Sequence, residues 1–425
     1  MRRRQNPPCQ QARARLAFLA AVADDGGLMA PASRSRRPRR PHFVVAGAGF
    51  SGAVLARRLV ETLKFAKVTV LDERPHIGGN CHTERDASTG VMLHVYGPHI
   101  FNTSDGRVWE YVNRFASFGP FVNRVKAVTS RGVFGMPVNL HTINQFFGRT
   151  FSPAEAREFV ASLGDRSIGE PRNFEEQALK MLGRDLYETF FYGYTKKQWG
   201  CEPRELPASV LKRLPVRFDY NDNYYDKKFQ GIPLDGYSAI VEKILGHPRI
   251  EVRLGQRVDP AAPPASAHLF FTGSLDAFFG YRLGPLGYRT VTFERHEQEG
   301  DYQGNAQVNY PGMDVPWTRI TEHKHFTPWE THERTVYFKE FSKETGPRDT
   351  PYYPKRLAAD KPLLARYREL GRQQRGVSFL GRLGTYRYMD MAPTIGEALD
   401  FADRFLPAWA SGADLPVFPN EESPS

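Results

Sequence analysis

The sequence predicts an α/β protein in which a parallel sheet is joined by a helical insertion and by an antiparallel β-sheet. Three observations predict this class. Residues 42–72 read as strand, turn, helix and strand, residues 142–214 have apolar side chains at helical spacing, and residues 288–340 alternate as strands do. The chain of 425 residues is long enough for roughly two or three domains with cores of their own.

The first of these segments begins with an apolar strand, Phe43–Ala46, that leads into three glycines. Gly47, Gly49 and Gly52 have GxGxxG spacing. In such a motif the first glycine allows a tight turn, the second lets a pyrophosphate approach the backbone, and the third lets the helix pack closely on the strand. The free N–H groups at the start of the helix then face the phosphates.

A helix over 53–63 and a second strand, Val68–Leu71, complete the unit and lead to Asp72. A carboxylate at this place can accept a hydrogen bond from a ribose hydroxyl. Together these parts indicate a Rossmann-like dinucleotide-binding domain, where the alternative is a glycine-rich turn in an ordinary βαβ unit. The continuation, residues 73–80, contains an acid, an arginine and a glycine pair, and it is similar to FAD enzymes of the amine-oxidase and glutathione-reductase kind. We therefore expect FAD rather than NAD.

Positive charge is concentrated at the start of the chain. The net charge is +11, but residues 1–41 hold ten arginines against two aspartates, which leaves only +3 for the remainder. We therefore expect no nucleic-acid partner. Residues 1–41 are predicted to be a basic, disordered tail or an over-extended start with initiation near Met29. The apolar run Leu16–Ala23 raises an export signal as the alternative, but it is short.

Cysteine use and hydropathy point to the cytoplasm. Cys9, Cys81 and Cys201 are far apart and offer neither a disulfide framework nor paired metal ligands. No apolar run approaches the roughly 18 residues of a membrane-spanning helix. His323 and His325 alternate on a predicted strand and resemble a metal pair, but we expect no metal there.

The rest of the chain divides into helical and β-rich segments. Ser152 followed by Pro153 is a helix start, and residues 174–182 and 186–191 are predicted amphipathic helices. Residues 216–235 are rich in Tyr, Asn and Asp and are predicted to be irregular. The expected domains are a discontinuous FAD-binding domain (42–100, about 230–285 and 376–410), a helical domain with a substrate lid (about 140–215) and a β-sheet substrate domain (about 101–139, 216–229 and 286–375).

Six motifs outside the glycine-rich unit carry a specific resemblance. They are YGPHIF (96–101), GYTKKQWG (193–200), KRLPVRF (212–218), TRITEHKHF (318–326), PYYP (351–354) and GRLGTYRYMDM (381–391). In this order and spacing, from His42 to about Phe405, the chain resembles the bacterial UDP-galactopyranose mutase family.

The resemblance implies a redox-neutral isomerisation. UDP-galactopyranose and UDP-galactofuranose would interconvert through a covalent adduct between N5 of reduced FAD and the anomeric carbon, and the furanose would supply cell-surface glycans. It also implies an external flavin reductant such as NAD(P)H, a homodimer, and no metal.

The resemblance assigns the substrate site to particular side chains. Arg213 and Arg319 match a pair of diphosphate-binding arginines, a role that suits the bidentate guanidinium fork, and Arg289 matches a further active-site arginine. Tyr194 matches a uridine-stacking tyrosine and Phe190 lies one helical turn before it. An isolated arginine is more often a surface or ion-pair residue, and both aromatic rings could instead belong to a helical core. The other implied substrate residues are Asn123, Thr195, Trp199 (in the lid), Tyr224, Asn309, Tyr353 and Tyr388.

The resemblance also completes the cofactor site. His99 would lie beside the flavin ring, the Arg382 cation would stabilise the anionic reduced flavin, and the helix that begins near Asp390 would point its positive end at the ring. One departure is Asn102, where the family usually has a second histidine. The full set of predicted cofactor residues is Gly47, Gly49, Phe50, Ser51, Gly52, Asp72, Glu73, Gly79, Asn80, His99, Ile100, Arg382, Met389, Asp390 and Met391.

Two other functions fit the dinucleotide motif alone. One is an FAD-dependent oxidoreductase of the amine-oxidase type, and the other is a non-catalytic flavoprotein or a binding protein that uses the basic tail. Neither explains the paired arginines or the KQWG and PYYP motifs.

Overall fold

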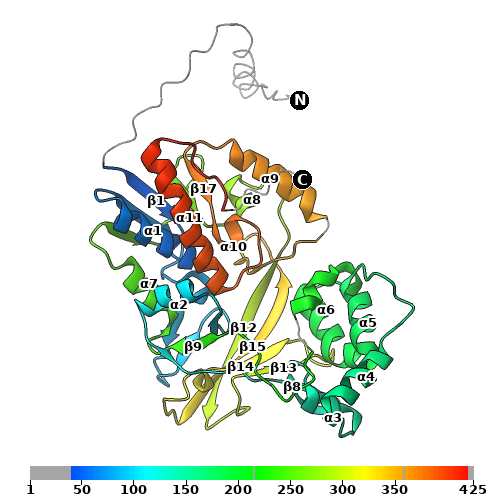
Figure 1. Ribbon diagram of the computed structural model, residues 1–425. Coiled ribbons are helices and arrows are strands. Elements are labelled where there is room, and N and C mark those ends of the chain that lie inside the picture. Colours follow the sequence, from blue (N-terminus) through cyan, green and yellow to red (C-terminus); the bar gives the residue numbers. More distant parts are fainter. Residues whose placement is uncertain (1–39, 214–215, 358, 420–425) are drawn as a thin grey trace, which may run out of the picture. The chain divides into compact units, whose positions relative to one another are not determined.

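Two β-sheets and a group of helices dominate the computed structural model of the chain (Figure 1). The structure describes residues 40–213, 216–357 and 359–419, without the side chains of residues 212 and 213. The predictions for the N-terminal tail therefore lie outside the described residues. The described residues belong to one compact unit.

The first sheet has five strands, and every neighbouring pair is parallel. Its order is β10 (Ile250–Leu254), β2 (Lys67–Asp72), β1 (His42–Ala46), β11 (His268–Phe271) and β17 (Val377–Phe379). The central strand β1 is apolar and buried along most of its length, as expected for a parallel strand covered on both faces. The predicted α/β, Rossmann-like fold is confirmed.

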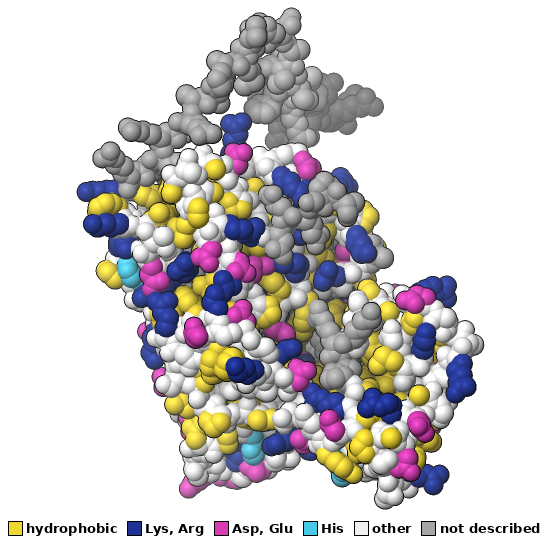
Figure 2. All heavy atoms as spheres, in the orientation of Figure 1, with side chains coloured by type: hydrophobic (Ala, Val, Ile, Leu, Met, Phe, Trp, Pro, Cys, Tyr) yellow, Lys and Arg dark blue, Asp and Glu magenta, His cyan; other side chains and the backbone are white. Residues whose placement is uncertain are grey.

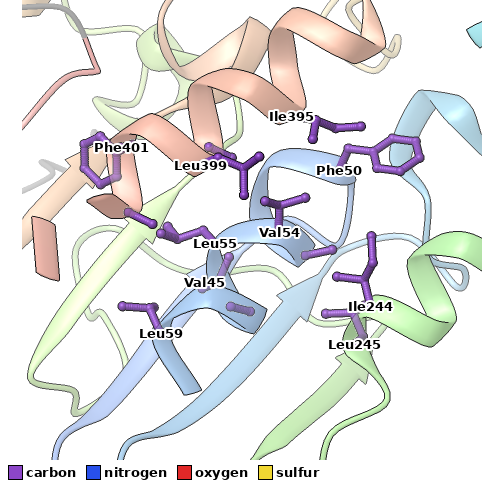
Figure 3. Close-up of a cluster of buried hydrophobic side chains, with 14 of the residues drawn as sticks. Val45, Phe50, Val54, Leu55, Leu59, Ile244, Leu245, Ile395, Leu399 and Phe401 are labelled. Carbon is purple, nitrogen blue, oxygen red and sulfur yellow. The ribbon is translucent and has the colours of Figure 1, made fainter. Parts of the chain in front are cut away.

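Three helices cover this sheet and form its main core: α1 (Phe50–Thr62), α7 (Gly236–Leu245) and α11 (Met391–Ser411). Figure 3 shows Val54, Leu55 and Leu59 of α1 between Ile395, Leu399 and Phe401 of α11 and Ile244 and Leu245 of α7. Each such buried side chain contributes about 1.5–3 kcal/mol relative to an exposed one. This packing fixes the N-terminal ends of α1 and α11, which both reach the site described below.

The second sheet has seven strands in the order β16 (Tyr353–Pro354), β12 (Tyr288–Glu299), β15 (Arg334–Glu344), β14 (Arg319–Glu322), β13 (Gln307–Asn309), β7 (Val125–Thr129) and β8 (Gly132–Met136). It is antiparallel except for the β13–β7 pair. In this register Asn309 lies opposite Arg319, and Arg319 lies opposite Glu340. The sheet therefore places three polar side chains side by side on neighbouring strands.

The helical group contains α3 (Leu140–Phe147), α4 (Pro153–Leu163), α5 (Phe174–Tyr187), a π-helical turn η2 (Glu188–Tyr192) and α6 (Gly193–Trp199). Ser152 starts α4 with a capping box, as its sequence predicts. The helices predicted over 174–182 and 186–191 are separated by a kink of α5 at Gly183, which has a φ of 74° and leaves no room for a Cβ beside Leu163, and residues 188–191 lie in η2. The predicted KQWG lid loop is in fact the end of helix α6 and the residue after it.

Two further predictions are wrong in detail. His323 and His325 lie in a short 3-10 helix, η5 (His323–Phe326), because β14 ends at Glu322. Part of the segment predicted to be irregular forms β9 (Phe229–Pro233), which pairs with β5 and β6. Asn102 on β5 donates to the Ile100 carbonyl.

The remaining elements are short or peripheral. They are α2 (Gly106–Asn113), α8 (Leu275–Phe278), α9 (Asp360–Arg372), α10 (Gly381–Gly384), β3 (Thr83–Arg85), β4 (Met92–His94), β5 (Phe101–Thr103), β6 (Phe118–Gly119), η1 (Gly79–Cys81), η3 (Pro203–Glu205) and η4 (Ala208–Arg213).

The surface of the described residues carries both signs of charge. Figure 2 shows basic and acidic side chains intermingled over one face. Within the part of the chain that the structure describes, no helix is long and apolar enough to cross a membrane.

Candidate functional site

A cavity of about 940 Å³ opens at the carboxyl ends of the parallel strands. Its lining includes the residues that follow β1, β2, β11 and β17. Open α/β sheets bind their ligands at this edge. Of the predicted cofactor residues, only Gly52 and Ile100 do not line it: the lining holds Gly47, Gly49, Phe50, Ser51, Asp72, Glu73, Gly79, Asn80, His99, Arg382, Met389, Asp390 and Met391.

Close approaches require two glycines of the motif, Gly47 and Gly52. A Cβ on Gly47, which has a φ of 114°, would lie 2.0 Å from the Thr272 hydroxyl oxygen. A Cβ on Gly52 would lie 2.0 Å from the Gly47 carbonyl oxygen, so Gly52 acts from beneath the cavity by letting α1 pack on the turn. Gly49 is the N-cap of α1 and no side chain caps that helix, which leaves its first N–H groups for an anionic ligand. The Ile100 side chain, by contrast, is buried in a separate cluster with Phe121 and Phe326.

The acid after β2 has a structural task in addition to its predicted one. The Asp72 carboxylate accepts from the backbone N–H of Ala48 at 2.8 Å and of Arg74 at 2.9 Å, so it holds the glycine turn. Glu73 is exposed in the cavity and lies 3.7 Å from the Arg257 guanidinium. Glu73 is therefore the more accessible partner for a ribose hydroxyl.

Arg74 is a lining residue that the sequence reasoning did not include among the site residues. Its Nη2 donates to Asn80 at 2.9 Å, its guanidinium lies 4.8 Å from the centroid of the Tyr96 ring, and its Nη1 is buried without a partner among the described residues. A buried donor of this kind suits an anionic ligand. The loop Thr345–Pro351 and the segment Gln256–Val258 also line the cavity, and neither contains a motif that could have revealed it.

Arg382 and His99 also line the cavity. Arg382 donates to the carbonyls of Met389 and Tyr352, and its guanidinium lies over the rings of Tyr353 and Tyr388, at 5.7 and 5.4 Å from their centroids. These backbone carbonyls thus hold the Arg382 guanidinium in one position. Burial, with the Arg382 and Arg319 cations nearby, lowers the pKa of His99 to about 4, so its imidazole is neutral at pH 7. A cavity of this size, with free helix N–H groups and a fixed cation in its lining, fits FAD.

Beside His99 lies a buried ion pair between Arg319 and Glu340. The Nε of Arg319 is 3.1 Å from the Glu340 carboxylate, and the two side chains are 19% and 3% exposed. Burial raises the pKa of Glu340, and the nearby Arg319 cation opposes this increase. Burial also disfavours the charged form of Arg319, but the Glu340 carboxylate outweighs this effect, and the pKa of Arg319 is well above its ordinary value. The guanidinium therefore stays charged in a poorly hydrated place, which strengthens its attraction for a phosphate.

Phenols surround this pair. Burial raises the pKa of Tyr194, Tyr224 and Tyr353, so each hydroxyl keeps its proton at neutral pH, and the Arg319 cation acts on all three. The rings of Tyr353 and Tyr388 stack at 5.6 Å. The structure thus brings four of the predicted substrate residues together around Arg319.

The other predicted substrate residues fall into two groups. Asn309 lies opposite Arg319 in the sheet, and Asn123 is buried, donates to Gln307 at 2.6 Å and keeps an unpartnered Oδ1. Thr195 and Trp199 lie on α6, where Thr195 is buried and Trp199 packs partly against the helical core.

Two other predicted site residues, Phe190 and Arg289, make contacts that stabilise the fold. Phe190 is buried in the helical core against Phe134 and Phe146, which is the alternative that the sequence left open. Arg289 donates to the carbonyls of Lys197 and Gln198 and pairs with Glu344 at 2.8 Å. It holds the end of α6. The substrate roles of both residues remain predictions.

The second predicted diphosphate arginine cannot be placed. Arg213 ends η4, and its side chain lies outside the described residues.

Asp301, Glu322 and His325 are the one group in the described part of the chain with the spacing of a metal site. Glu322 already accepts hydrogen bonds from Thr335 and from the backbone N–H of Tyr302, Gln303 and Gly304, and the Lys324 ammonium pairs with Asp301 at 2.5 Å. These hydrogen bonds and this ion pair account for the short distances among the three side chains.

Comparisons with known proteins agree with this site. A UDP-galactopyranose mutase family model matches residues 189–388, and an NAD(P)-binding Rossmann-like domain model matches residues 45–115. A probable UDP-galactopyranose mutase of Klebsiella pneumoniae is 53% identical over 377 residues, which cover 89% of this chain and 98% of that protein. A dTDP-fucopyranose mutase of Escherichia coli is 50% identical over 370 residues, which cover 85% of this chain and 98% of that protein.

A solved structure of reduced UDP-galactopyranose mutase has the same fold, with a TM-score of 0.68 and 17% identity over 88% of this chain and 98% of that one. The extent of the Klebsiella and Escherichia matches decides the family. The chain belongs to the UDP-galactopyranose mutase family and is a flavin-dependent pyranose–furanose mutase of nucleotide sugars.

Proposed function

We propose that the chain interconverts UDP-galactopyranose and UDP-galactofuranose. The observation that carries this proposal is the partly buried Arg319 guanidinium, which lies among phenols and near His99, a lining residue of the cofactor cavity. A diphosphate between a base and a sugar needs such a fixed, poorly hydrated cation.

The side chains have complementary tasks in this proposal. Arg319 binds the diphosphate, helped by the Arg213 of the same family motif set. The hydroxyls of Tyr353 and Tyr388 donate to phosphate oxygens, and Tyr194 stacks on the base. Glu340 balances the Arg319 charge when no phosphate is present, so the cation is not left unpaired in the empty site.

FAD, when bound in its reduced form, supplies the nucleophilic N5 that receives the sugar's anomeric carbon. The chain's part is to bind and orient. The Gly47 turn and the N-terminal end of α1 hold the pyrophosphate, the Arg382 cation favours the anionic reduced ring, and the neutral His99 adds no competing charge. We further propose an external reductant such as NAD(P)H, a homodimer and a cytoplasmic location.

A second candidate is the conversion of dTDP-fucopyranose, because a dTDP-fucopyranose mutase is nearly as similar to this chain as the UDP-galactopyranose relative. The two substrates differ at three places: fucose lacks the hydroxyl on C6, and the thymidine nucleotide carries a methyl on the base and lacks the ribose 2′-hydroxyl. A site that hydrogen-bonds a substrate hydroxyl lowers kcat/KM for the analogue without that hydroxyl by about 10⁴-fold. A site shaped for the substrate without the hydroxyl lowers kcat/KM for the analogue that carries it by only about 10²-fold.

The test uses the whole chain with FAD reduced by dithionite. The kcat/KM is measured by chromatography for UDP-galactopyranose, dTDP-fucopyranose, and the two mixed compounds dTDP-galactopyranose and UDP-fucopyranose. The mixed compounds separate selection of the sugar from selection of the nucleoside. We expect UDP-galactopyranose to have the highest value by at least about 10²-fold.

A higher value for dTDP-fucopyranose would select the second candidate. Net oxidation of the sugar with flavin turnover, instead of isomerisation, would refute both. Arg319→Ala should abolish most conversion while the bound flavin stays, and Arg172→Ala, at an exposed arginine that pairs with Glu176, is the matched control.

A further inference from the structure

The ammonium group of Lys197 lies inside a ring of four backbone carbonyls. Its Nζ is 2.7 Å from the oxygen of Tyr310, 2.6 Å from that of Gly312, 3.0 Å from that of Val315 and 2.8 Å from that of Trp317. An ammonium has three donors, so all of them are used within this ring. The loop 310–317 is therefore folded around a single positive charge.

This loop connects the two strands that carry predicted substrate residues. It joins β13 to β14, between Asn309 and Arg319, which lie opposite each other. Lys197 itself lies on α6, the helix of Tyr194, Thr195 and Trp199. Its contact ties the helix of the predicted uridine site to the hairpin of the predicted diphosphate site.

A second contact on the same face of α6 supports this link. Gly193 lies four residues before Lys197, one helical turn away. A Cβ on Gly193 would lie 2.3 Å from the Pro311 carbonyl oxygen and 3.2 Å from the Met313 sulfur, so the loop packs directly on the helix backbone.

The C-terminal end of α6 contacts the long strands of the second sheet. Arg289 on β12 and Ser342 on β15 donate to the Gln198 carbonyl at 3.0 and 2.7 Å. Figure 1 shows α6 as the helix of its group that lies toward β12 and β15. The C-terminal end of the helix is thus fixed to the sheet, and the loop is fixed to the helix.

The Lys197 charge is present at neutral pH. Burial lowers the pKa of Lys197 to about 8, against the opposing effect of Asp314 in the loop. Without the ammonium, four carbonyl dipoles would point at one another, and the loop would have to rearrange.

We propose that Lys197 is a positioning residue for the nucleotide sugar: by holding loop 310–317 on α6, it sets the spacing between Tyr194 and Arg319 without contacting the substrate. The inference rests on the proposed roles of these two residues in substrate binding. A displacement of about 1 Å between two binding groups can cost about 10²-fold.

The test compares Lys197→Met with Lys196→Met, which removes the same charge from the neighbouring residue, a surface lysine that pairs with Glu202. UDP affinity is measured by fluorescence titration, and KM and kcat with the reduced protein. For Lys197→Met we expect the Kd for UDP and the KM to rise about 10- to 100-fold, with kcat changed by less than about threefold and FAD content unchanged. Lys196→Met should stay within about twofold, and Lys197→Arg should restore most of the affinity because it keeps the charge.

Equal values for Lys197→Met and Lys196→Met would overturn the inference, and so would a loss confined to kcat. If Lys197→Met does not fold, Gly193→Ala displaces the loop with the charge intact; a raised Kd for UDP supports the inference and an unchanged Kd rejects it. Failure of the proposed function is distinguishable, because the wild-type chain would then convert no UDP-galactopyranose while the UDP titrations still compare the variants.

Discussion

The cofactor cavity and the substrate side of the site are built in opposite ways. The cavity lies at the ends of parallel strands, and the neighbours of Gly47 in its lining and of Gly52 beneath it leave no space for a Cβ. The substrate side is formed by side chains from separate elements, gathered around the buried Arg319–Glu340 pair. The first therefore depends on shape, and the second on the balance of charge.

The two halves meet at His99 and Arg382. Both line the cavity, and the Arg319 cation is close enough to act on His99. Because different forces hold the two halves, we expect substitutions to separate cofactor retention from substrate binding. The predictions below test that separation.

The largest effect is expected in the glycine turn. Gly52→Val places a Cβ 2.0 Å from the Gly47 carbonyl oxygen and 2.9 Å from Val45, and backbone cannot yield as a flexible side chain does. We expect the variant to lose its bound flavin and most of its soluble yield, measured by visible absorbance per protein.

The control is Gly106→Ala, at a helical glycine with nothing within 4 Å of the added Cβ. It should retain flavin fully. Wild-type flavin content in Gly52→Val would show that the cavity does not depend on this close approach.

The next effect is expected at the buried ion pair. Arg319→Met leaves the Glu340 carboxylate buried without its partner, which should lower the free energy of unfolding by about 3–5 kcal/mol. The double variant Arg319→Met/Glu340→Met removes both charges and should recover much of that stability. Neither should convert substrate, and both should retain flavin, as measured by urea unfolding, product chromatography and absorbance.

Recovery of conversion in the double variant would contradict the diphosphate role of Arg319. Equal stability of the single and double variants would instead mean that the pair is not electrostatically coupled.

A third comparison separates core from substrate contact among the aromatics. Phe190→Ala removes a ring packed against Phe134 and Phe146, so we expect a loss of about 3–5 kcal/mol in unfolding free energy. Tyr194→Ala should instead weaken UDP binding about 10-fold, since stacking on a base is worth about 1–3 kcal/mol. Weaker UDP binding by a stably folded Phe190→Ala would return Phe190 to the substrate site.

The same contrast explains what could be predicted from the sequence. The glycine motif is contiguous, and each of its residues has one local purpose, so spacing alone predicted the parallel fold and part of the cavity lining, next to β1 and β2. Asp72 shows the limit: its position is that of a ribose ligand, but its oxygens accept from the turn itself.

The substrate side needed a family resemblance, because nothing local links residues on different elements. Arg319 and Glu340 are far apart in sequence and become partners only through strand register. Lys197 had no local signal either, since its four acceptors are backbone carbonyls of a distant loop. The helix break at Gly183 and the short helix at His323–Phe326 likewise depend on tertiary packing.

The smallest effect concerns His99 and two buried histidines, His94 and His323, that connect the two halves. The backbone N–H of His99 donates to Nδ1 of His94 at 3.0 Å, and that of His94 donates to Nδ1 of His323 at 3.2 Å. Nδ1 of His94 and Nδ1 of His323 must therefore carry no proton. Burial, with smaller contributions from neighbouring charges, lowers the pKa of His94 well below its ordinary value of 6.5 and that of His323 to about 3.

The pKa of each of these two histidines is lower in the native state than in the unfolded state. At pH values between the two pKa values the native state therefore binds fewer protons than the unfolded state, and the free energy of unfolding falls as the pH falls through this range. From pH 7 to pH 5 we expect a loss of about 2 kcal/mol for each histidine, measured by urea unfolding. His323→Asn keeps an acceptor for the His94 N–H but cannot titrate, so its stability should fall less steeply with acidification. His141→Asn, at an exposed histidine on α3, should keep the wild-type slope. Equal slopes for His323→Asn and wild type would mean that acid acts on other groups, and the junction between the two halves would then hold no proton-sensitive link at His323.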